Sequence, residues 1–420
     1  MIQKKERATT ALSFHMEERV MIKHCELIMV DGDENHNRIF NMEQINSCQF
    51  RATWGRYGSS MSTRLYSMDV WDALRNKKLK SGYTDITKLQ SVIAESKDLK
   101  YSPISDSEIE SLVNKILRYA NECIEQNYSI KKQDVTHSMI DSARKEIDKL
   151  SDMAIENASV ESFNKSLENL FCIIPRQMKD VAEYLAKSTD DYEKIIIREN
   201  DLLNVLSAMV CDDDAKQEEK IKKPTILEAF GISISPCDEQ EIGNIKKLLT
   251  RESAGKLKCA YRISNKKIDT RFEEYIKEYQ IQKRDCHLYW HGTRNRNVWG
   301  ILKKGMLLNP NTIVNSKMFG YGLYFAPRAK KSIGYTSIKG AHWVSEFSDE
   351  GYLFLMEVAY KKPLVVYKFE SWLKRARKEL INNKGCDAVF ASKDYGMLYN
   401  DEVIVYDKAQ ARPRYLIIIK

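Results

Sequence analysis

Paired cysteines are missing from this chain of 420 residues. Its nine cysteines are scattered, and no two of them form a Cys-x-x-Cys pair. Zinc fingers hold their metal with closely spaced cysteines, and small disulfide-stapled domains need paired ones. We therefore expect neither a metal finger nor a disulfide framework, and we expect the thiols to be reduced.

Long apolar runs are missing as well. No stretch approaches the roughly twenty apolar residues that a membrane-spanning helix needs, and the opening run Met-Ile-Gln-Lys-Lys-Glu-Arg lacks the apolar core of a signal peptide. No internal repeat or low-complexity tract stands out. The sequence therefore predicts an intracellular protein that does not contact a membrane.

What is present is a composition typical of soluble globular proteins. Hydrophobic residues make up 43% of the chain and charged residues 30%, and the length predicts two to four domains. The net charge of +8 comes from 67 basic and 59 acidic residues. This mild excess is compatible with nucleic-acid binding but does not by itself indicate it.

The first hundred residues have the alternation of strands. Residues 1–10 are polar and are expected to be disordered. Residues 11–100 alternate between apolar and polar positions, with a turn-rich run at 31–35 that predicts a hairpin loop and a helix expected over 69–79. This segment is therefore predicted to be a small antiparallel sheet with one helix.

The middle of the chain changes to helical spacing. Over 101–211, apolar residues recur every three or four positions, and one such stripe contains Ile109, Leu112, Val113, Ile116, Leu117, Ala120 and Cys123. Similar stripes, including one at 178–185, predict a central α-helical bundle, with Pro175 between helices. The charged run at 212–223 is expected to be a linker to a last domain at 224–420.

Histidine, glycine and tyrosine motifs gather in this last domain. His291 and Gly292 are followed by the run from Phe319 to Ala326, which contains Gly-x-Gly and Tyr324, and then by Lys331, Ser332 and Tyr335. Glycine lets a ligand approach the backbone, tyrosine rings can sandwich a planar group, and an imidazole can fix one hydroxyl. Such a pocket suits a flat, amide-bearing ligand attached to a sugar.

These motifs, in this order, resemble the catalytic domain of the poly(ADP-ribose) polymerases, which have a diphtheria-toxin-like, mixed α+β ADP-ribosyltransferase fold. Members of that family use NAD as the donor and need no metal. The resemblance covers about the last third of the chain and includes the late run Tyr399-Asn400-Asp401-Glu402-Val403-Ile404-Val405-Tyr406. Any one of these motifs alone is a weak indication.

The resemblance implies a role for each site residue. His291 would bind the adenine-side ribose, and the backbone of Gly292 with the Ser332 hydroxyl would hold the nicotinamide amide. The ring would stack between tyrosines, and a carboxylate would stabilise the developing oxocarbenium ion and orient the nucleophile. The implied residues are Tyr335 and Tyr324 for stacking, Glu402 as the carboxylate, Lys331 on the acceptor side, and Thr293 and Gly300 lining the NAD site.

Two positions depart from the family pattern. Asp401 stands where relatives often place the catalytic Glu, and strand alternation favours Glu402 without deciding the register. Leu307 stands where many relatives have an Arg that contacts NAD. That replacement concerns affinity for the adenosine side of NAD rather than the reaction.

The other two regions also resemble parts of DNA-dependent family members. Trp54-Gly55-Arg56, with the closing run from Lys80 to Asp85, resembles the WGR domain, in which Trp54 would stack at a DNA break and Arg56 would grip phosphate. The alternative is a buried Trp beside a solvated charge run. The helical bundle resembles the regulatory domain that blocks NAD entry until DNA binds, and its alternative is an inert spacer.

The sequence thus predicts a multidomain α+β protein, monomeric when free, that transfers ADP-ribose from NAD to acidic or serine side chains of itself and other proteins. The resemblance implies activation by DNA breaks, growth of a polymer, and a place in the nucleus of a eukaryote or near the nucleoid of a bacterium. A DNA-independent mono-transferase and an inactive DNA-repair scaffold are the alternatives.

Overall fold

The protein was analysed as a computed structural model, which describes residues 23–90, 101–210, 223–308, 318–341, 347–368, 370–395 and 398–420. Two predicted segments, the disordered amino terminus and nearly all of the 212–223 linker, lie outside these residues. The chain divides into two compact units. One contains the described residues through Ile28 together with Arg38–Thr87, and the other contains Met29–Asn37 and Lys88–Lys420.

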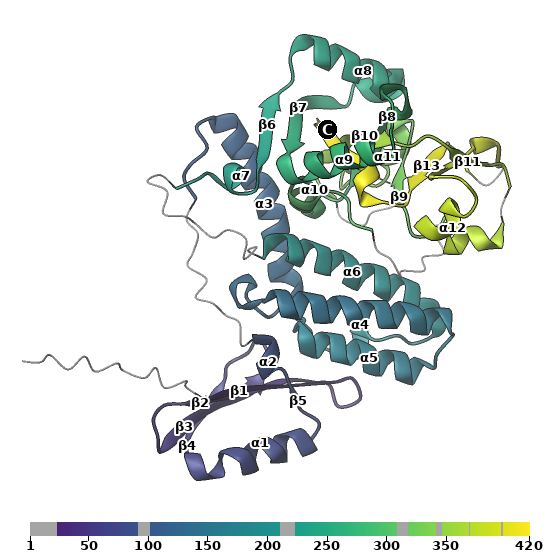
Figure 1. Ribbon diagram of the computed structural model, residues 1–420. Coiled ribbons are helices and arrows are strands. Elements are labelled where there is room, and N and C mark those ends of the chain that lie inside the picture. The colour runs from purple at the N-terminus through teal and green to yellow at the C-terminus, as the bar shows by residue number, and fades with distance from the viewer. Residues whose placement is uncertain are drawn as a thin grey trace, which may run out of the picture. The chain divides into compact units, whose positions relative to one another are not determined.

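The amino-terminal region is a five-stranded sheet with a helix, as the alternating pattern predicts (Figure 1). The strand order is β4-β3-β2-β1-β5, and β2, β3 and β4 pair antiparallel. Phe50 and Trp71 pack edge to face with ring centroids 4.9 Å apart, which fixes the helix on the sheet. The elements are β1 (His24–Asp31), β2 (His36–Gln44), β3 (Gln49–Arg56), β4 (Ser62–Ser67), β5 (Thr84–Asp85), α1 (Trp71–Lys80) and α2 (Thr87–Gln90).

The described part of the middle region contains four long helices, and three of them begin with a side-chain cap. Side chains of Asp106, Thr136 and Ser159 accept hydrogen bonds from the first free backbone N–H groups of three of them. The helices are α3 (Ser107–Asn127), α4 (His137–Ile155), α5 (Val160–Ile173) and α6 (Tyr192–Met209). No helix among the described residues is both long and apolar enough to cross a bilayer.

The helix predicted for residues 178–185 was wrong. That stretch forms only a 3-10 turn at Ala182–Tyr184. The backbone just before it pairs with the end of α3 instead, since Gln177 N–H donates to the Asn127 carbonyl at 3.0 Å. The apolar side chains at 178 and 181 are still buried, so burial without helical hydrogen bonding produced the misleading spacing.

The carboxyl-terminal region is built on two sheets. A five-stranded sheet has the order β6-β7-β14-β10-β8, and a four-stranded sheet has the order β11-β12-β13-β9. The first contains β6 (Ile232–Pro236), β7 (Leu257–Asn265), β14 (Ala411–Ile419), β10 (Gly351–Ala359) and β8 (Cys286–Thr293), and the second contains β11 (Pro363–Val366), β12 (Ala388–Ala391), β13 (Glu402–Val405) and β9 (Leu323–Phe325). The helices are α7 (Ile226–Ala229), α8 (Glu239–Ala254), α9 (Lys266–Glu278), α10 (Val298–Lys304), α11 (Ala329–Ile333) and α12 (Lys378–Asn382).

The two sheets meet at one backbone bridge. Trp290 of β8 and Ala326, just after β9, exchange two N–H···O=C hydrogen bonds of 2.9 Å. Trp290 is almost completely buried, so this junction is fixed by packing as well as by hydrogen bonds. It places the end of β8 beside β9, and through β9 beside β13.

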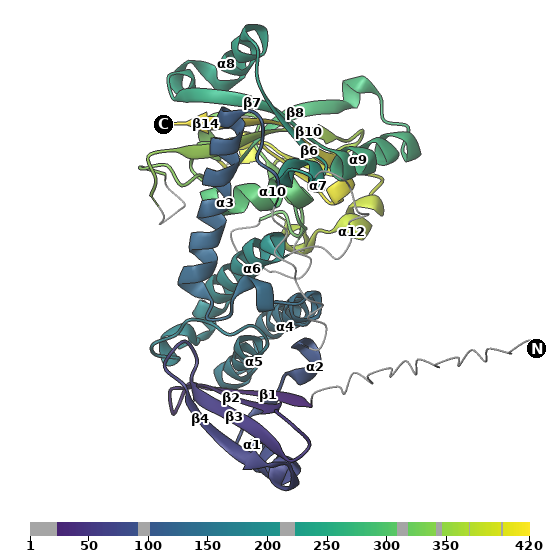
Figure 2. The same cartoon turned by 90° about the vertical axis from the view of Figure 1, so that its left-hand side faces the viewer.

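Helix α3 joins the helical region to the carboxyl-terminal sheets, and Figure 2 shows it running from the other helices up alongside the strands. Its apolar stripe enters the same core cluster as α10 and β10, and each such buried aliphatic side chain contributes about 1.5 to 3 kcal/mol relative to exposure. Tyr119 packs edge to face on Tyr352, and the Lys115 ammonium contacts the Glu350 carboxylate at 2.5 Å. The helical region and the last domain are therefore one compact unit.

Candidate active site

His291 lies near the end of β8, beside the junction of the two sheets. Its Nδ1 is 3.2 Å from the Tyr324 carbonyl oxygen. A carbonyl can only accept, so Nδ1 carries the proton of this hydrogen bond and Nε2 is left as an acceptor when the ring is neutral. Burial lowers the pKa of His291 to about 4. The neutral ring is thus prepared to accept a hydrogen bond from a hydroxyl at physiological pH.

Gly292 is required by the close approach of α11. A Cβ built on Gly292 would lie 1.7 Å from the carbonyl oxygen of Ser332 and 2.6 Å from its carbonyl carbon. Both atoms belong to backbone, and Ser332 is buried. Only glycine therefore lets β8 and α11 pack together, and this contact brings the predicted amide-binding residues Gly292 and Ser332 side by side.

Tyr324 is held by the loop before β9. Its hydroxyl donates to the Gly320 carbonyl at 2.9 Å and accepts from the Phe319 N–H at 3.2 Å. Burial raises its pKa well above the ordinary tyrosine value, so it stays a neutral phenol. Tyr335 lies close enough to raise that pKa further, and 44% of the surface of this residue is exposed. An exposed ring next to a fixed one is suited to receive a planar group.

Glu402 begins β13 and contacts Lys331 of α11 as an ion pair. Both side chains are largely shielded from solvent, at 12% and 19% exposure. Burial lowers the pKa of Lys331 to about 8, and the carboxylate acts in the opposite direction, so the lysine stays protonated at neutral pH. The pair brings the carboxylate of β13 to the helix that also packs on Gly292.

The neighbouring carboxylate is directed elsewhere. Asp401 accepts a hydrogen bond of 2.7 Å from the backbone N–H of Lys393, where it holds the turn after β12. Glu402 is the one that faces Lys331. This division of partners favours Glu402 over Asp401 as the carboxylate of the site.

Three further predicted positions lie around this core. Thr293 is buried and pairs with Tyr352 across β8 and β10. Gly300 lies in α10, where a Cβ would be 3.4 Å from the Ala208 methyl group, so it faces α6 rather than β8. Leu307 follows α10 with 38% of its surface exposed.

The two predicted DNA-binding residues lie on β3 of the first unit. Trp54 stacks on Phe40 with ring centroids 5.9 Å apart and is only partly exposed. Arg56 is also partly exposed and stands opposite Arg38 across β2 and β3. One face of the Trp54 ring is therefore already occupied by Phe40.

Sequence reasoning missed an acidic residue of α6 that contacts the segment after His291. Asp201 accepts hydrogen bonds from Arg294 at 2.5 Å, Arg296 at 2.8 Å and Asn297 at 3.0 Å. Burial alone would raise the pKa of Asp201, but Arg296 and Arg294 hold it below the usual range. The signal available in the sequence was an Asp on the apolar stripe of a predicted helix, at a position where a charge needs a partner.

Comparison with known proteins agrees with this geometry. Residues 239–420 match the family model described as the poly(ADP-ribose) polymerase catalytic domain. Protein 101L of Invertebrate iridescent virus 6, itself uncharacterized, is 29% identical over 187 residues, which are 44% of this chain and 77% of that protein. The putative poly [ADP-ribose] polymerase-like 100L of the same virus is 29% identical over 167 residues, 38% of this chain and 83% of that protein.

Larger relatives match over a smaller share of their length. Poly [ADP-ribose] polymerase 2 of Homo sapiens is 30% identical over 171 residues, which are 34% of this chain and 28% of that enzyme. These matches place residues 239–420 in the poly(ADP-ribose) polymerase family as a catalytic domain. The chain therefore carries the domain of an NAD-dependent ADP-ribosyltransferase.

Proposed function

We propose that this chain is an NAD-dependent protein poly-ADP-ribosyltransferase that is activated by DNA breaks and modifies itself and other proteins. The observation that carries the transferase part is the gathering of His291, Gly292, Tyr324 and the Lys331–Glu402 pair at the junction of β8, β9, α11 and β13. A neutral imidazole, a tight backbone cradle and a shielded carboxylate are what transfer from a nicotinamide ribose requires.

Donor binding would use the first part of this arrangement. Nε2 of His291 would accept a hydrogen bond from a hydroxyl of the adenine-side ribose, because Nδ1 is occupied by the Tyr324 carbonyl. The nicotinamide amide would bind where β8 meets α11, between the Gly292 backbone and the Ser332 hydroxyl. Tyr335 supplies the exposed ring face on which the nicotinamide would stack.

The reaction breaks the bond between the ribose C1′ and the nicotinamide nitrogen. Nicotinamide leaves as a neutral base because the pyridinium takes the bonding electron pair. The acceptor oxygen forms the new bond to C1′, and its proton leaves the complex. Glu402 would bind the ribose 2′-hydroxyl, stabilise the oxocarbenium character of C1′ and orient the acceptor oxygen. No metal is required in this scheme, since the leaving group already carries positive charge.

Chain growth is inferred from the same residues. Relatives that transfer a single unit often lack the glutamate, whereas this chain has Glu402 together with His291 and Tyr324. Lys331 would stand on the acceptor side, where its ammonium orients the carboxylate. Acidic or serine side chains would be the first acceptors, and hydroxyls of the bound ADP-ribose would follow.

DNA activation is supported by the chemistry of the two preceding regions. The first unit has a WGR-like sheet and helix, with Trp54 and Arg56 on β3 and a helix ending in Lys77, Lys78 and Lys80. Binding of DNA ends would use that positive charge and one ring face of Trp54. Asp201 of α6 forms a hydrogen-bonded ion pair with Arg294 of the catalytic domain. A movement of α6 would therefore displace the segment after His291.

Labelled NAD with and without nicked DNA tests the proposal. Slowly migrating smears of modified protein that appear only with DNA are expected. One sharp modified band without DNA would support a DNA-independent mono-transferase instead. If the folded protein takes up no label under any condition, the chain is an inactive scaffold.

A pair of isosteric variants tests the carboxylate. Glu402→Gln should keep NAD binding and lose chain growth, because the neutral amide has one acceptor oxygen and no negative charge to stabilise the oxocarbenium character of C1′. Asp401→Asn is the matched control and should keep both. If Asp401→Asn abolishes chain growth and Glu402→Gln keeps it, the assignment of Glu402 as the catalytic carboxylate is wrong.

A further inference from the structure

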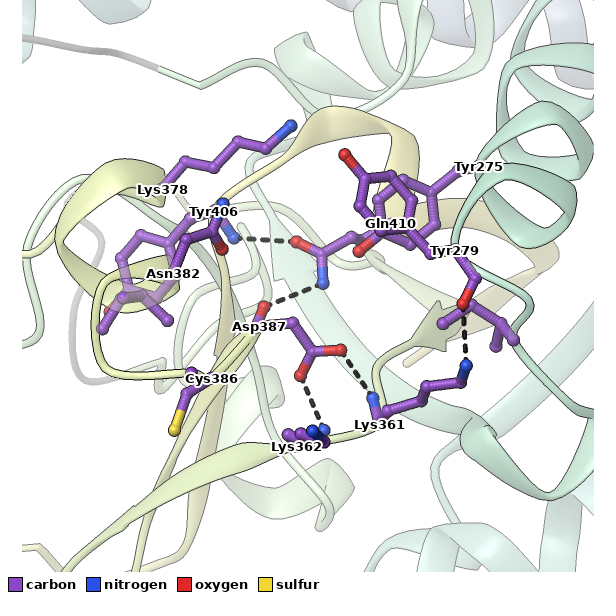
Figure 3. A pocket seen from close by; sticks show the side chains of 13 residues that line it. Tyr275, Tyr279, Lys361, Lys362, Lys378, Asn382, Cys386, Asp387, Tyr406 and Gln410 are labelled. Carbon is purple, nitrogen blue, oxygen red and sulfur yellow. Dashed lines mark hydrogen bonds between the residues drawn. The ribbon is translucent and has the colours of Figure 1, made fainter.

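A cavity of about 200 Å³ lies in the catalytic domain away from the residues proposed for NAD (Figure 3). It opens between α9, the turn that joins β10 to β11, and the segment from α12 to β12. Its lining includes Tyr275, Tyr279, Lys361, Lys362, Lys378 and Cys386. None of His291, Ser332, Lys331 and Glu402 lines it.

The lining contains three lysines and one aspartate, and Lys378 is also paired with Asp407 beside the cavity. Both oxygens of Asp387 are already engaged, since they accept the backbone N–H groups of Lys361 at 2.7 Å and Lys362 at 2.8 Å. Asp387 therefore shapes the turn and has little capacity left for the three ammonium groups. An anion in the cavity would be attracted to the ammonium groups of its lining.

Two of the lysines are held in place at the rim. The Lys361 ammonium donates to the Tyr279 carbonyl at 2.7 Å, and the Lys378 ammonium contacts Asp407 at 2.5 Å. An ammonium has three donors, so the Lys361 ammonium keeps two of them for a ligand beyond its bond to Tyr279. A held lysine loses less side-chain entropy when it binds, which favours a preformed anion site over a mobile charge run.

An aromatic wall completes the cavity. Tyr275 and Tyr279 are stacked with centroids 4.5 Å apart, and Tyr279 is 40% exposed. The Lys378 ammonium lies 5.9 Å from the Tyr279 ring centroid, on the lined side. The cavity thus combines cationic donors with a ring, the two features that bind phosphate and a base or sugar face together.

Size decides which phosphates fit. Drug-sized ligands occupy pockets of roughly 300 to 1,000 Å³, so a whole dinucleotide does not fit here. The space equals that of roughly six or seven water molecules, more than a single phosphate fills. We propose that this cavity binds the diphosphate of a nucleoside diphosphate group, as found in ADP and ADP-ribose, with the nucleoside against Tyr279.

Cys386 provides a reporter at the edge of the site. This half-buried residue belongs to the lining of the cavity, and its thiol donates to the Lys384 carbonyl at 3.6 Å. The rate of its alkylation by iodoacetamide, measured by peptide mass spectrometry on the full chain, should fall about tenfold when ADP is at ten times its dissociation constant. Cys48, an exposed thiol of the first unit, should react at an unchanged rate. Because the readout is one peptide, ADP bound at the NAD site does not confuse it.

Two ligands and two variants decide the outcome. Adenosine should give no protection, and equal protection by adenosine would overturn the anion site. Equal protection by inorganic phosphate would overturn the nucleotide assignment. Lys362→Gln should abolish protection by ADP, whereas Lys368→Gln, an exposed lysine outside the lining, should retain it.

Lys362 is exposed, so its replacement should change stability by less than about 0.5 kcal/mol. An unchanged melting temperature makes loss of protection attributable to the site. Protection that persists in folded Lys362→Gln would overturn the proposal. Transfer of ADP-ribose does not enter this experiment, so its result stands apart from the proposed activity.

Discussion

Replacing Gly292 by alanine is the sharpest test of how the site is assembled. The added Cβ would lie 1.7, 2.6 and 3.2 Å from the O, C and Cα atoms of Ser332. No side chain can move aside to relieve this contact, because all three atoms belong to the backbone of Ser332 in α11. The helix or the strand must shift, and the residues that each contributes to the site shift with it.

The expected magnitude follows from the packing around the contact. Overpacking a close-packed interior costs about 1 to 3 kcal/mol, and the buried neighbours Trp290 and Ala329 argue for the upper end. For a domain of about 200 residues each kcal/mol lowers the melting temperature by roughly 2 to 4 °C. At about 3 kcal/mol, we expect Gly292→Ala to lower it by about 6 to 12 °C and to weaken NAD binding.

Gly243 is the matched control. It lies within α8 with no atom inside 4 Å of the added Cβ, so alanine there should stabilise the helix by about 0.5 to 1 kcal/mol. Thermal unfolding and isothermal titration with NAD measure both effects. If Gly292→Ala melts and binds NAD like Gly243→Ala, the close contact of β8 with α11 is wrong.

Three further perturbations test the electrostatics. Burial lowers the pKa of His291 to about 4, so the folded protein keeps this ring neutral at a pH where the unfolded chain already protonates it. The folded state should therefore lose at most about 3 kcal/mol of stability as the pH falls from 6.5 to about 4. An NMR titration midpoint near 6.5 would contradict this. Asp201→Asn removes the charge that pairs with Arg294 and should cost about 2 to 3 kcal/mol, seen in thermal unfolding. If α6 also restrains the site, that variant should label itself without DNA. Lys331→Ala should lower kcat roughly tenfold with little change in KM for NAD, because the Glu402 carboxylate loses the ammonium that orients it. A change in KM alone would contradict the proposed role of Lys331 in orienting Glu402.

Local patterns predicted the elements well where burial and periodicity agree. The stripe of α3 is buried at Ile109, Leu112 and Ile116, and α5 begins at the predicted residue, 160. The same reasoning failed at 178–185, because apolar residues can be buried by an irregular segment whose backbone bonds close a short turn or go to a side chain such as Asn35. Periodicity reports burial, and hydrogen-bond partners decide the element.

The site residues were expected from short motifs that resemble those of a known family, and the fold adds long-range contacts to them. Gly292 needs to be glycine because of Ser332, forty positions later in the chain. The sequence contains both residues but not their distance. Strand alternation favoured Glu402 over Asp401 without deciding the register, and the partner of each carboxylate came only from the fold.

What could not be predicted is the pairing of charges between regions that look independent along the chain. Asp201 lies in the middle of α6 in the central region, and its three partners lie more than ninety residues away, at Arg294, Arg296 and Asn297. No local rule selects them, because a solvated Arg on a loop and a paired Arg have the same sequence signal. This cluster connects α6 to residues 294–297, which directly follow β8, the strand that carries His291 and Gly292. The contact between the helical region and the segment after His291 therefore depends on ion pairs whose partners only the fold reveals.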